Sequence, residues 1–104
     1  MAETNNRMRP VHPGEILKED VLAPMGLSAN ALARELRVPV TRISEILHGR
    51  RAVTADTALR LARYLGTNAQ FWLNLQASYD LKVAQRALGR QIEREVHPRN
   101  SAAA

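Results

Sequence analysis

Apolar residues recur at helical spacing along most of the chain, and no stretch sustains the alternation of apolar and polar residues that a strand would show. At about 100° per residue, side chains three, four and seven positions apart share one side of a helix. This pattern predicts an all-α fold, with helices at residues 13–22, 29–36, 40–48, 55–65 and 71–81.

The apolar side of each expected helix defines the expected core. A stripe of this kind must pack against another element to leave water. In the fifth helix, Phe71 and Trp72 are interpreted as core or subunit packing rather than as stacking surfaces for bases. The stripes of the first four helices consist of Ile16, Leu17, Val21, Ala29, Leu32, Ala33, Leu36, Val40, Ile43, Ile46, Leu47, Ala58, Leu61, Ala62 and Leu65.

Proline, glycine and hydroxyl residues mark the expected helix ends. Pro13 suits an early helical position, and Pro24 with Gly26 should stop the first helix before "APMG". Gly49 and Gly66 should end the third and fourth helices. The expected N-terminal caps are Ser28, Thr54 and Thr67, the last with Gln70 at capping-box spacing.

The two ends of the chain are less strongly patterned than its middle. Residues 1–11 are expected to form a flexible arm, and residues 12–82 a single domain. Residues 83–104 are expected to form a C-terminal helical extension, broken or kinked near Gly89, with a frayed tail.

The charge balance points to an anionic partner. The 104 residues carry a formal net charge of +5, which favours nucleic acid first and a membrane surface second. Solubility alone is the plainer explanation of the charge. No apolar run approaches the ~20 residues of a membrane span, and "MAETNNRMRP" lacks the apolar core of a secretory signal. We therefore expect a cytoplasmic protein that does not contact a membrane.

The residue types also limit the chemistry. The chain has no cysteine, which excludes disulfides and thiolate metal sites. Its three histidines are too scattered to indicate a metal site, so no metal and no cofactor are expected. Ser44, His48 and Asp80 have neither the motif nor the oxyanion site that nucleophilic catalysis needs. An enzyme is therefore not expected.

The second and third helices have the arrangement of a helix-turn-helix. They are short, closely spaced and joined by a tight turn, and the third is polar on its outer face. Ala33 lies where the two axes must approach closely. The turn carries Arg37 where many such turns carry glycine, which costs roughly 1–2 kcal/mol if the backbone is left-handed there. Pro39 can shorten the turn. An ordinary helical hairpin would explain the apolar stripes but not the polar outer face beside a basic loop.

The segments "HPGEIL" and "LSANALARELRVPVTRISEILHGRRAVTADTALRLARYLGTNAQFWLNLQASYDL" together resemble the HigA-type antitoxins, a branch of the lambda-repressor-like (Xre) helix-turn-helix proteins. The similarity covers about residues 12–82. It implies a five-helix domain, a homodimer and an inverted-repeat operator in double-stranded DNA. It also implies a small ribonuclease toxin as partner, encoded beside the antitoxin, and repression of their shared promoter.

The outer face of the third helix carries the candidate base-reading residues. The major groove admits one α-helix, whose N-terminal residues reach base edges. Arg42 can fork onto guanine O6 and N7, and Thr41 can donate a hydrogen bond or offer its methyl group. Val40 can touch a thymine methyl, unless it belongs to the core. Glu45 can accept from cytosine N4 or hold Arg42 in position.

The resemblance places Pro39, Arg42 and Glu45 on the family's reading face. Thr41, Arg42 and Glu45 could instead be ordinary surface side chains. Phosphate contacts are expected to set register and to supply most of the affinity. Residues 27–53 hold five arginines against two glutamates, a local excess of +3. The expected phosphate contacts are Ser28, Asn30, Arg34, His48, Arg50 and Arg51.

The expected dimer interface consists of Trp72, Leu75, Tyr79 and residues 82–96.

Two other functions would fit the same sequence. One is a stand-alone regulator without a toxin, and the other is a module that only masks a toxin. RNA binding is disfavoured, because the basic segment lacks the stacking aromatics that single strands require.

Overall fold

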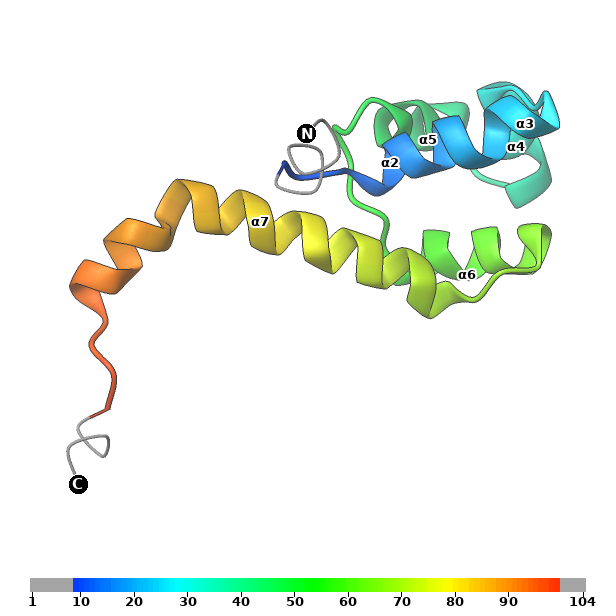
Figure 1. The fold of residues 1–104 in the computed structure, drawn as a ribbon. Coiled ribbons are helices and arrows are strands. Elements are labelled where there is room, and N and C mark those ends of the chain that lie inside the picture. Colours follow the sequence, from blue (N-terminus) through cyan, green and yellow to red (C-terminus); the bar gives the residue numbers. More distant parts are fainter. Residues whose placement is uncertain (1–8, 100–104) are drawn as a thin grey trace.

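The computed structural model describes residues 9–99, and every regular element within them is a helix (Figure 1). The five-helix, all-α prediction is confirmed. The first helical rod is continuous and comprises three segments with different hydrogen bonding. The elements are α2 (Pro13–Ile16), η1 (Leu17–Leu22), α3 (Ala23–Met25), α4 (Ala29–Leu36), α5 (Val40–Leu47), α6 (Ala55–Leu65) and α7 (Ala69–Glu95).

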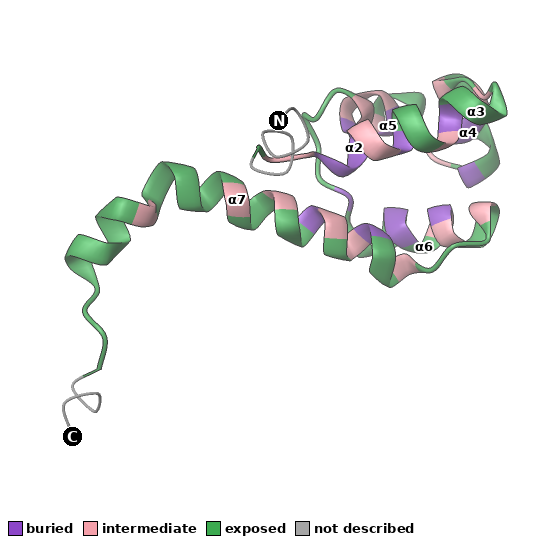
Figure 2. Ribbon diagram, viewed as in Figure 1, coloured by how far each residue is buried: buried purple, intermediate pink, exposed green. Residues whose placement is uncertain are grey.

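The core lies between the first rod, α4, α5, α6 and the beginning of α7. Figure 2 shows buried positions gathered there, while most of α7 is exposed along its length. The predicted stripes supply nearly all of the core, and Leu22 and Val53 join it without having been predicted. The fully buried apolar residues are Leu17, Leu22, Leu32, Ala33, Leu36, Ile43, Ile46, Val53, Ala58, Leu61 and Trp72.

The first helix does not stop before Pro24, as the sequence pattern predicts, but runs to Met25. The segment before the proline is a π-helix, in which the Ala23 amide donates to the Lys18 carbonyl five residues earlier. Wider hydrogen bonding of this kind lets a helix pass a residue that has no amide hydrogen. Gly26, with φ +62°, then ends the helix.

The predicted caps are partly correct. Ser28 Oγ accepts from the Ala31 amide at 3.1 Å and starts α4 as expected. Thr54 occupies the N-cap position of α6, but its side chain makes no capping hydrogen bond. The cap of α7 is Asn68 rather than Thr67: Asn68 Oδ1 accepts from the Phe71 amide at 2.7 Å. Thr67 Oγ1 instead accepts from Trp72 Nε1, at 3.1 Å.

The last helix, α7, is one 27-residue element that passes through Gly89, so a break there is absent, but its axis bends in the orange part of the ribbon in Figure 1, which agrees with the alternative of a kink. Figure 1 shows its C-terminal half extending beyond the helical domain. Residues 97–99 are not helical, in agreement with a frayed end. The rest of the predicted tail, residues 100–104, and residues 1–8 of the predicted arm lie outside the described residues.

Arg37 adopts the left-handed conformation, with φ 60° and ψ 46°. Glycine at this position would remove the contact between Cβ and the following carbonyl, but it would also raise the entropy of the unfolded chain. We therefore expect Arg37→Gly to raise the free energy of unfolding by about 0.5–1 kcal/mol. Urea denaturation followed by circular dichroism measures this, and a lower midpoint would show that the arginine side chain supports the turn.

Candidate nucleic-acid interface

The helix-turn-helix is formed by α4, the turn at Arg37 and Val38, and α5. The Val38 amide donates to the Ala33 carbonyl at 3.0 Å, which closes the end of α4. Pro39 is the N-cap residue of α5, in an extended conformation (φ −62°, ψ 144°). Ala33 is buried, as expected for a residue at the close approach of the two axes.

The exposed start of α5 is formed by Pro39, Val40 and Thr41. Ile43 and Ile46, which project roughly opposite Thr41, are completely buried and fix the orientation of the helix. The assignment of Val40 to the apolar core stripe is wrong, because its side chain is 41% exposed. Val40 is the first residue of α5, almost one turn before the buried Ile43, at the exposed end of the helix. It remains a candidate for contact with a thymine methyl group.

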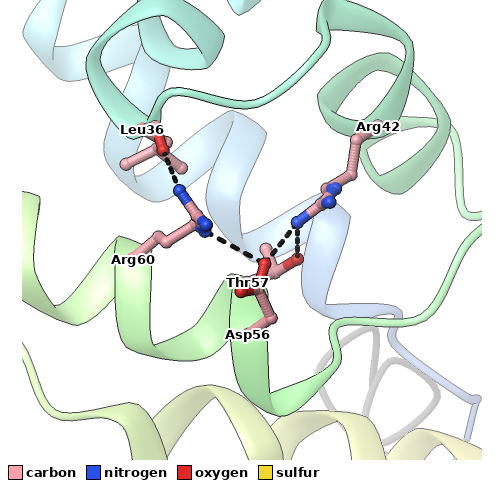
Figure 3. A network of polar contacts seen from close by, with 5 residues as sticks. All are labelled: Leu36, Arg42, Asp56, Thr57 and Arg60. Carbon is pink, nitrogen blue, oxygen red and sulfur yellow. Dashed lines mark hydrogen bonds and ion pairs between the residues drawn. The ribbon is translucent and has the colours of Figure 1, made fainter.

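Arg42, the candidate guanine reader, reaches across to the start of α6. Its Nη1 lies 2.5 Å from Asp56 Oδ2 and 3.5 Å from Thr57 Oγ1, and the side chain is 28% exposed (Figure 3). The expectation that Glu45 could hold Arg42 is therefore wrong. Glu45 Oε1 instead lies 2.7 Å from Arg51 Nε, in an ion pair with the loop that follows α5.

Asp56 has a second cationic neighbour from its own helix. Arg60 Nε lies 3.0 Å from Asp56 Oδ2, and Arg60 Nη1 donates to the Leu36 carbonyl at 2.8 Å. Hydrogen bonds from Arg42 and Arg60 hold the pKa of the Asp56 carboxyl below its usual range. This network joins α4, α5 and α6 (Figure 3).

The candidate phosphate contacts are all exposed, as such contacts must be. Ser28 and Asn30 lie at the start of α4, and His48, Arg50 and Arg51 follow α5. His48 Nδ1 lies 2.8 Å from the Ser44 carbonyl, and Arg51 is paired with Glu45. The remaining candidate, Arg34, lies in the last turn of α4 and is also exposed.

His12 supports the end of α5, a role that the sequence pattern does not indicate. Its Nδ1 accepts from the Gly14 amide at 2.9 Å, and its buried ring packs edge-on against Tyr79 at 4.8 Å. The ring also lies against Gly49, just after α5, where an added Cβ would be 3.8 Å from His12 Cγ. Burial lowers the pKa of His12 below its ordinary value of 6.5, so the neutral ring is the folded form.

This burial predicts a specific pH dependence. Since the unfolded chain binds the His12 proton more tightly than the folded chain does, stability should be complete above pH 6.5 and decline as pH falls below it. His12→Asn retains a capping acceptor but cannot titrate, so its stability should fall less steeply over this range. Urea denaturation at several pH values measures both proteins. Equal slopes would contradict the assignment, because His48 and His97 are exposed and present in both.

Gln76 is a second supporting residue, and its role has no signal in the sequence pattern. It is buried in α7, where Oε1 accepts from the Val53 amide at 2.8 Å and Nε2 donates to Asp80 at 2.9 Å. The amide therefore fixes the loop between α5 and α6 against α7. Asp80 is thus hydrogen-bonded to Gln76, and His48 Nδ1 lies beside the Ser44 carbonyl.

The predicted dimer interface is wrong for Trp72, whose side chain is 1% exposed inside its own subunit. Phe71, one position along the helix, is exposed instead and contacts Trp72 edge-on at 5.0 Å. Leu75 and Tyr79 are half-buried against the same subunit, so they offer a partner only part of their surface.

Within residues 9–99, none of the helices combines the length and the hydropathy that spanning a lipid bilayer requires. The same residues contain no group of three or more histidine or acidic side chains placed to hold a metal ion.

A helix-turn-helix family profile matches residues 17–72. Virulence-associated protein I of Dichelobacter nodosus is 59% identical over 81 residues, which cover 78% of this chain and 75% of the relative. An addiction module antidote protein of a HigA family from Coxiella burnetii has a solved structure with a TM-score of 0.84 and 53% identity, covering 88% of this chain and 99% of that one. The structure of Pseudomonas aeruginosa antitoxin HigA with the higBA promoter gives a TM-score of 0.85 and 48% identity, covering 86% and 98%.

Proposed function

The chain belongs to the helix-turn-helix family, in the branch of the HigA-type antitoxins, and we propose that it is a sequence-specific DNA-binding repressor that regulates its own promoter. The family relationship supports this, since the Pseudomonas aeruginosa relative has been solved with promoter DNA. The proposed function needs no catalysis and no cofactor, and it places the protein in the cytoplasm with the chromosome.

The observation that carries the proposal is the presentation of α5. Pro39, Val40 and Thr41 at its N-terminal end are exposed, while Ile43 and Ile46 in the next turns are completely buried. A short helix held in this way can enter the major groove with its N-terminus foremost. Arginines on the helix and the loop after it supply the positive charge that phosphates attract.

The base-reading residues we propose are those predicted from the sequence: Pro39, Val40, Thr41, Arg42 and Glu45. For the phosphate contacts, Arg50 is the strongest candidate, because it is exposed and forms no ion pair within the described residues. Arg51 and Glu45 hold each other, so either one must leave that pair to contact DNA. Ser28, Asn30, Arg34 and His48 complete the proposed phosphate contacts.

Footprinting on the DNA upstream of the protein's own gene tests the proposal. We expect protection of an inverted repeat whose half-sites lie about one helical turn, roughly 10 base pairs, apart. Competition with a shuffled duplex at stated salt separates specific from general binding. Equal affinity for both duplexes would reject sequence-specific repression.

We further propose that the repressor is a homodimer whose interface runs along the C-terminal half of α7. Leu88 and Ile92 are exposed there and Leu81 is exposed just before it, and at about 100° per residue the three fall within about 40° of one another. This apolar stripe lies on the part of α7 that extends beyond the domain (Figure 1). A second copy would cover it and would bring two α5 helices to the two halves of one operator.

Leu88→Glu should convert the dimer to a monomer and weaken operator binding on the order of a hundredfold, because the second half-site contact is no longer intramolecular. Analytical ultracentrifugation and a gel shift measure the two effects. Val83→Glu is the matched control, since Val83 is also exposed but lies on the far side of the helix. Similar behaviour of the two variants would place the interface elsewhere.

A small ribonuclease toxin is the second partner that we propose, on the family relationship. Co-expression with the protein encoded by the adjacent gene, followed by a pull-down, tests this partner directly. A stand-alone regulator would bind its operator but capture no such protein. A masking module without a role on DNA would capture the toxin and fail the footprinting experiment.

A further inference from the structure

Arg42 is held in the protein through one of its three guanidinium nitrogens. Nη1 contacts Asp56 Oδ2 and Thr57 Oγ1, and within residues 9–99 Nε and Nη2 donate to no other protein group. The Nε–Nη2 edge is a planar pair of donors. Two parallel donors are the geometry that matches guanine O6 and N7 in the major groove.

Asp56 is itself anchored on the side away from Arg42. Arg60 donates to the same Oδ2 at 3.0 Å and, through Nη1, to the carbonyl of Leu36. That carbonyl belongs to the last turn of α4, where helix carbonyls lack partners in the helix. The carboxylate that holds Arg42 is therefore fixed to the first helix of the helix-turn-helix and not to a mobile side chain alone (Figure 3).

The negative charge of Asp56 is unfavourable on a surface that binds DNA, unless the side chain has a further role. It lies at the start of α6 beside α5, and its side chain is 53% exposed. A carboxylate there repels phosphates, which lowers the affinity for every DNA sequence alike. Its contact with the base-reading arginine offers a compensating gain, because a side chain that is already ordered loses less entropy on binding.

We propose that Asp56 is a positioning residue, which orders Arg42 so that its Nε–Nη2 edge reads guanine while Nη1 stays on the carboxylate. The inference rests on the proposed DNA-binding function and specifies how one base of the operator is chosen. In the bound state Asp56 remains in contact with Arg42 and does not touch the DNA.

The test measures the ratio of affinities for the footprinted operator duplex and a shuffled duplex. Asp56→Ala should lower this ratio about three- to tenfold, the cost of ordering one long side chain at the moment of binding. Asp56→Asn also removes the charge but keeps an oxygen acceptor, so it should retain most of the ratio. Both variants should bind the shuffled duplex slightly more tightly and to the same extent.

A double-mutant cycle with Arg42→Ala shows whether Asp56 changes the affinity ratio through Arg42. In the Arg42→Ala protein, adding Asp56→Ala should leave the ratio unchanged, because no arginine is left to position. Asp20→Ala, at an exposed acidic position on the first helix, controls for the loss of one negative charge. Thermal melts by circular dichroism confirm that each variant is folded at the temperature of the binding assay.

Two outcomes would overturn this inference and leave the proposed DNA-binding function intact. An unchanged ratio in Asp56→Ala, with a lowered ratio in Arg42→Ala, would show that the arginine reads without support. A raised ratio in Asp56→Ala would show that the carboxylate competes with DNA for Arg42. An unchanged ratio in Arg42→Ala would overturn the inference together with the assignment of Arg42. Equal wild-type affinity for both duplexes would reject the proposed function itself.

Discussion

Gly14→Ala should lower the free energy of unfolding by about 3 kcal/mol, because a methyl group at this position has no room. A Cβ on residue 14 would lie 1.8 Å from the carbonyl oxygen of Ile46 and 2.6 Å from its carbon. Both atoms are backbone, so the first helix and the end of α5 must move apart. The total free energy of unfolding of a domain of this size is about 5–15 kcal/mol. The melting temperature of the variant should therefore fall by roughly 12–24 °C.

Gly89→Ala provides the opposite control. Gly89 lies inside α7, and apart from its chain neighbours and the nearby backbone of its own helix no atom lies within 4 Å of the position that an added methyl group would take, so alanine should raise stability by about 0.5–1 kcal/mol. Thermal melts of both variants by circular dichroism measure the difference. A Gly14→Ala protein as stable as the wild type would mean that the contact with Ile46 is not needed to hold α5 in place.

The elements that periodicity fixes are predicted well. The stripes around Leu32 and Leu61 lie on helices whose opposite faces are polar, so one orientation alone removes them from water. Gly49 and Gly66 end their helices at positive φ, a conformation that few other residues adopt freely. These features depend on residues within one or two turns of each other, which is the range over which a sequence pattern carries information.

Contacts between distant elements are predicted poorly. Pairing Glu45 with Arg42 assumes that neighbours on one helix interact, but each has a partner outside α5. Arg42 meets Asp56 because α5 and α6 both pack on α4, which brings the start of α6 within reach of the Arg42 side chain, and no spacing along the chain encodes that arrangement. Gln76 is similar: its role depends on the Val53 amide, which only the folded loop brings to it.

The error at Trp72 has a different cause. Phe71 and Trp72 are adjacent, so they project about 100° apart and both cannot face the core. The sequence alone does not show which of the two the core takes. The structure buries Trp72, whose indole nitrogen finds Thr67 Oγ1 at 3.1 Å, and leaves Phe71 exposed. A buried indole needs such an acceptor, and the interpretation of Thr67 as a helix cap assigns that hydroxyl elsewhere.

Arg42→Ala and Arg50→Ala should weaken operator binding in two different ways. Arg42→Ala should lose about 1–3 kcal/mol of discrimination at one base pair, because the bidentate hydrogen bond to guanine that favours the correct base is lost. Arg50→Ala should weaken binding to all sequences alike and reduce the slope of log K against log salt by about one unit, because one phosphate contact is lost. Titrations with single-base operator variants at several salt concentrations separate the two.

The structure makes this comparison sharper in one respect. Arg42→Ala leaves Asp56 paired with Arg60, so the surface near α5 becomes more negative, and binding to shuffled DNA should also weaken slightly. Arg50→Ala breaks no ion pair within residues 9–99, so its effect on binding reports the phosphate contact directly. If both variants lose discrimination equally, or if both change the salt slope alone, the division between base reading by α5 and anchoring by the following loop is wrong.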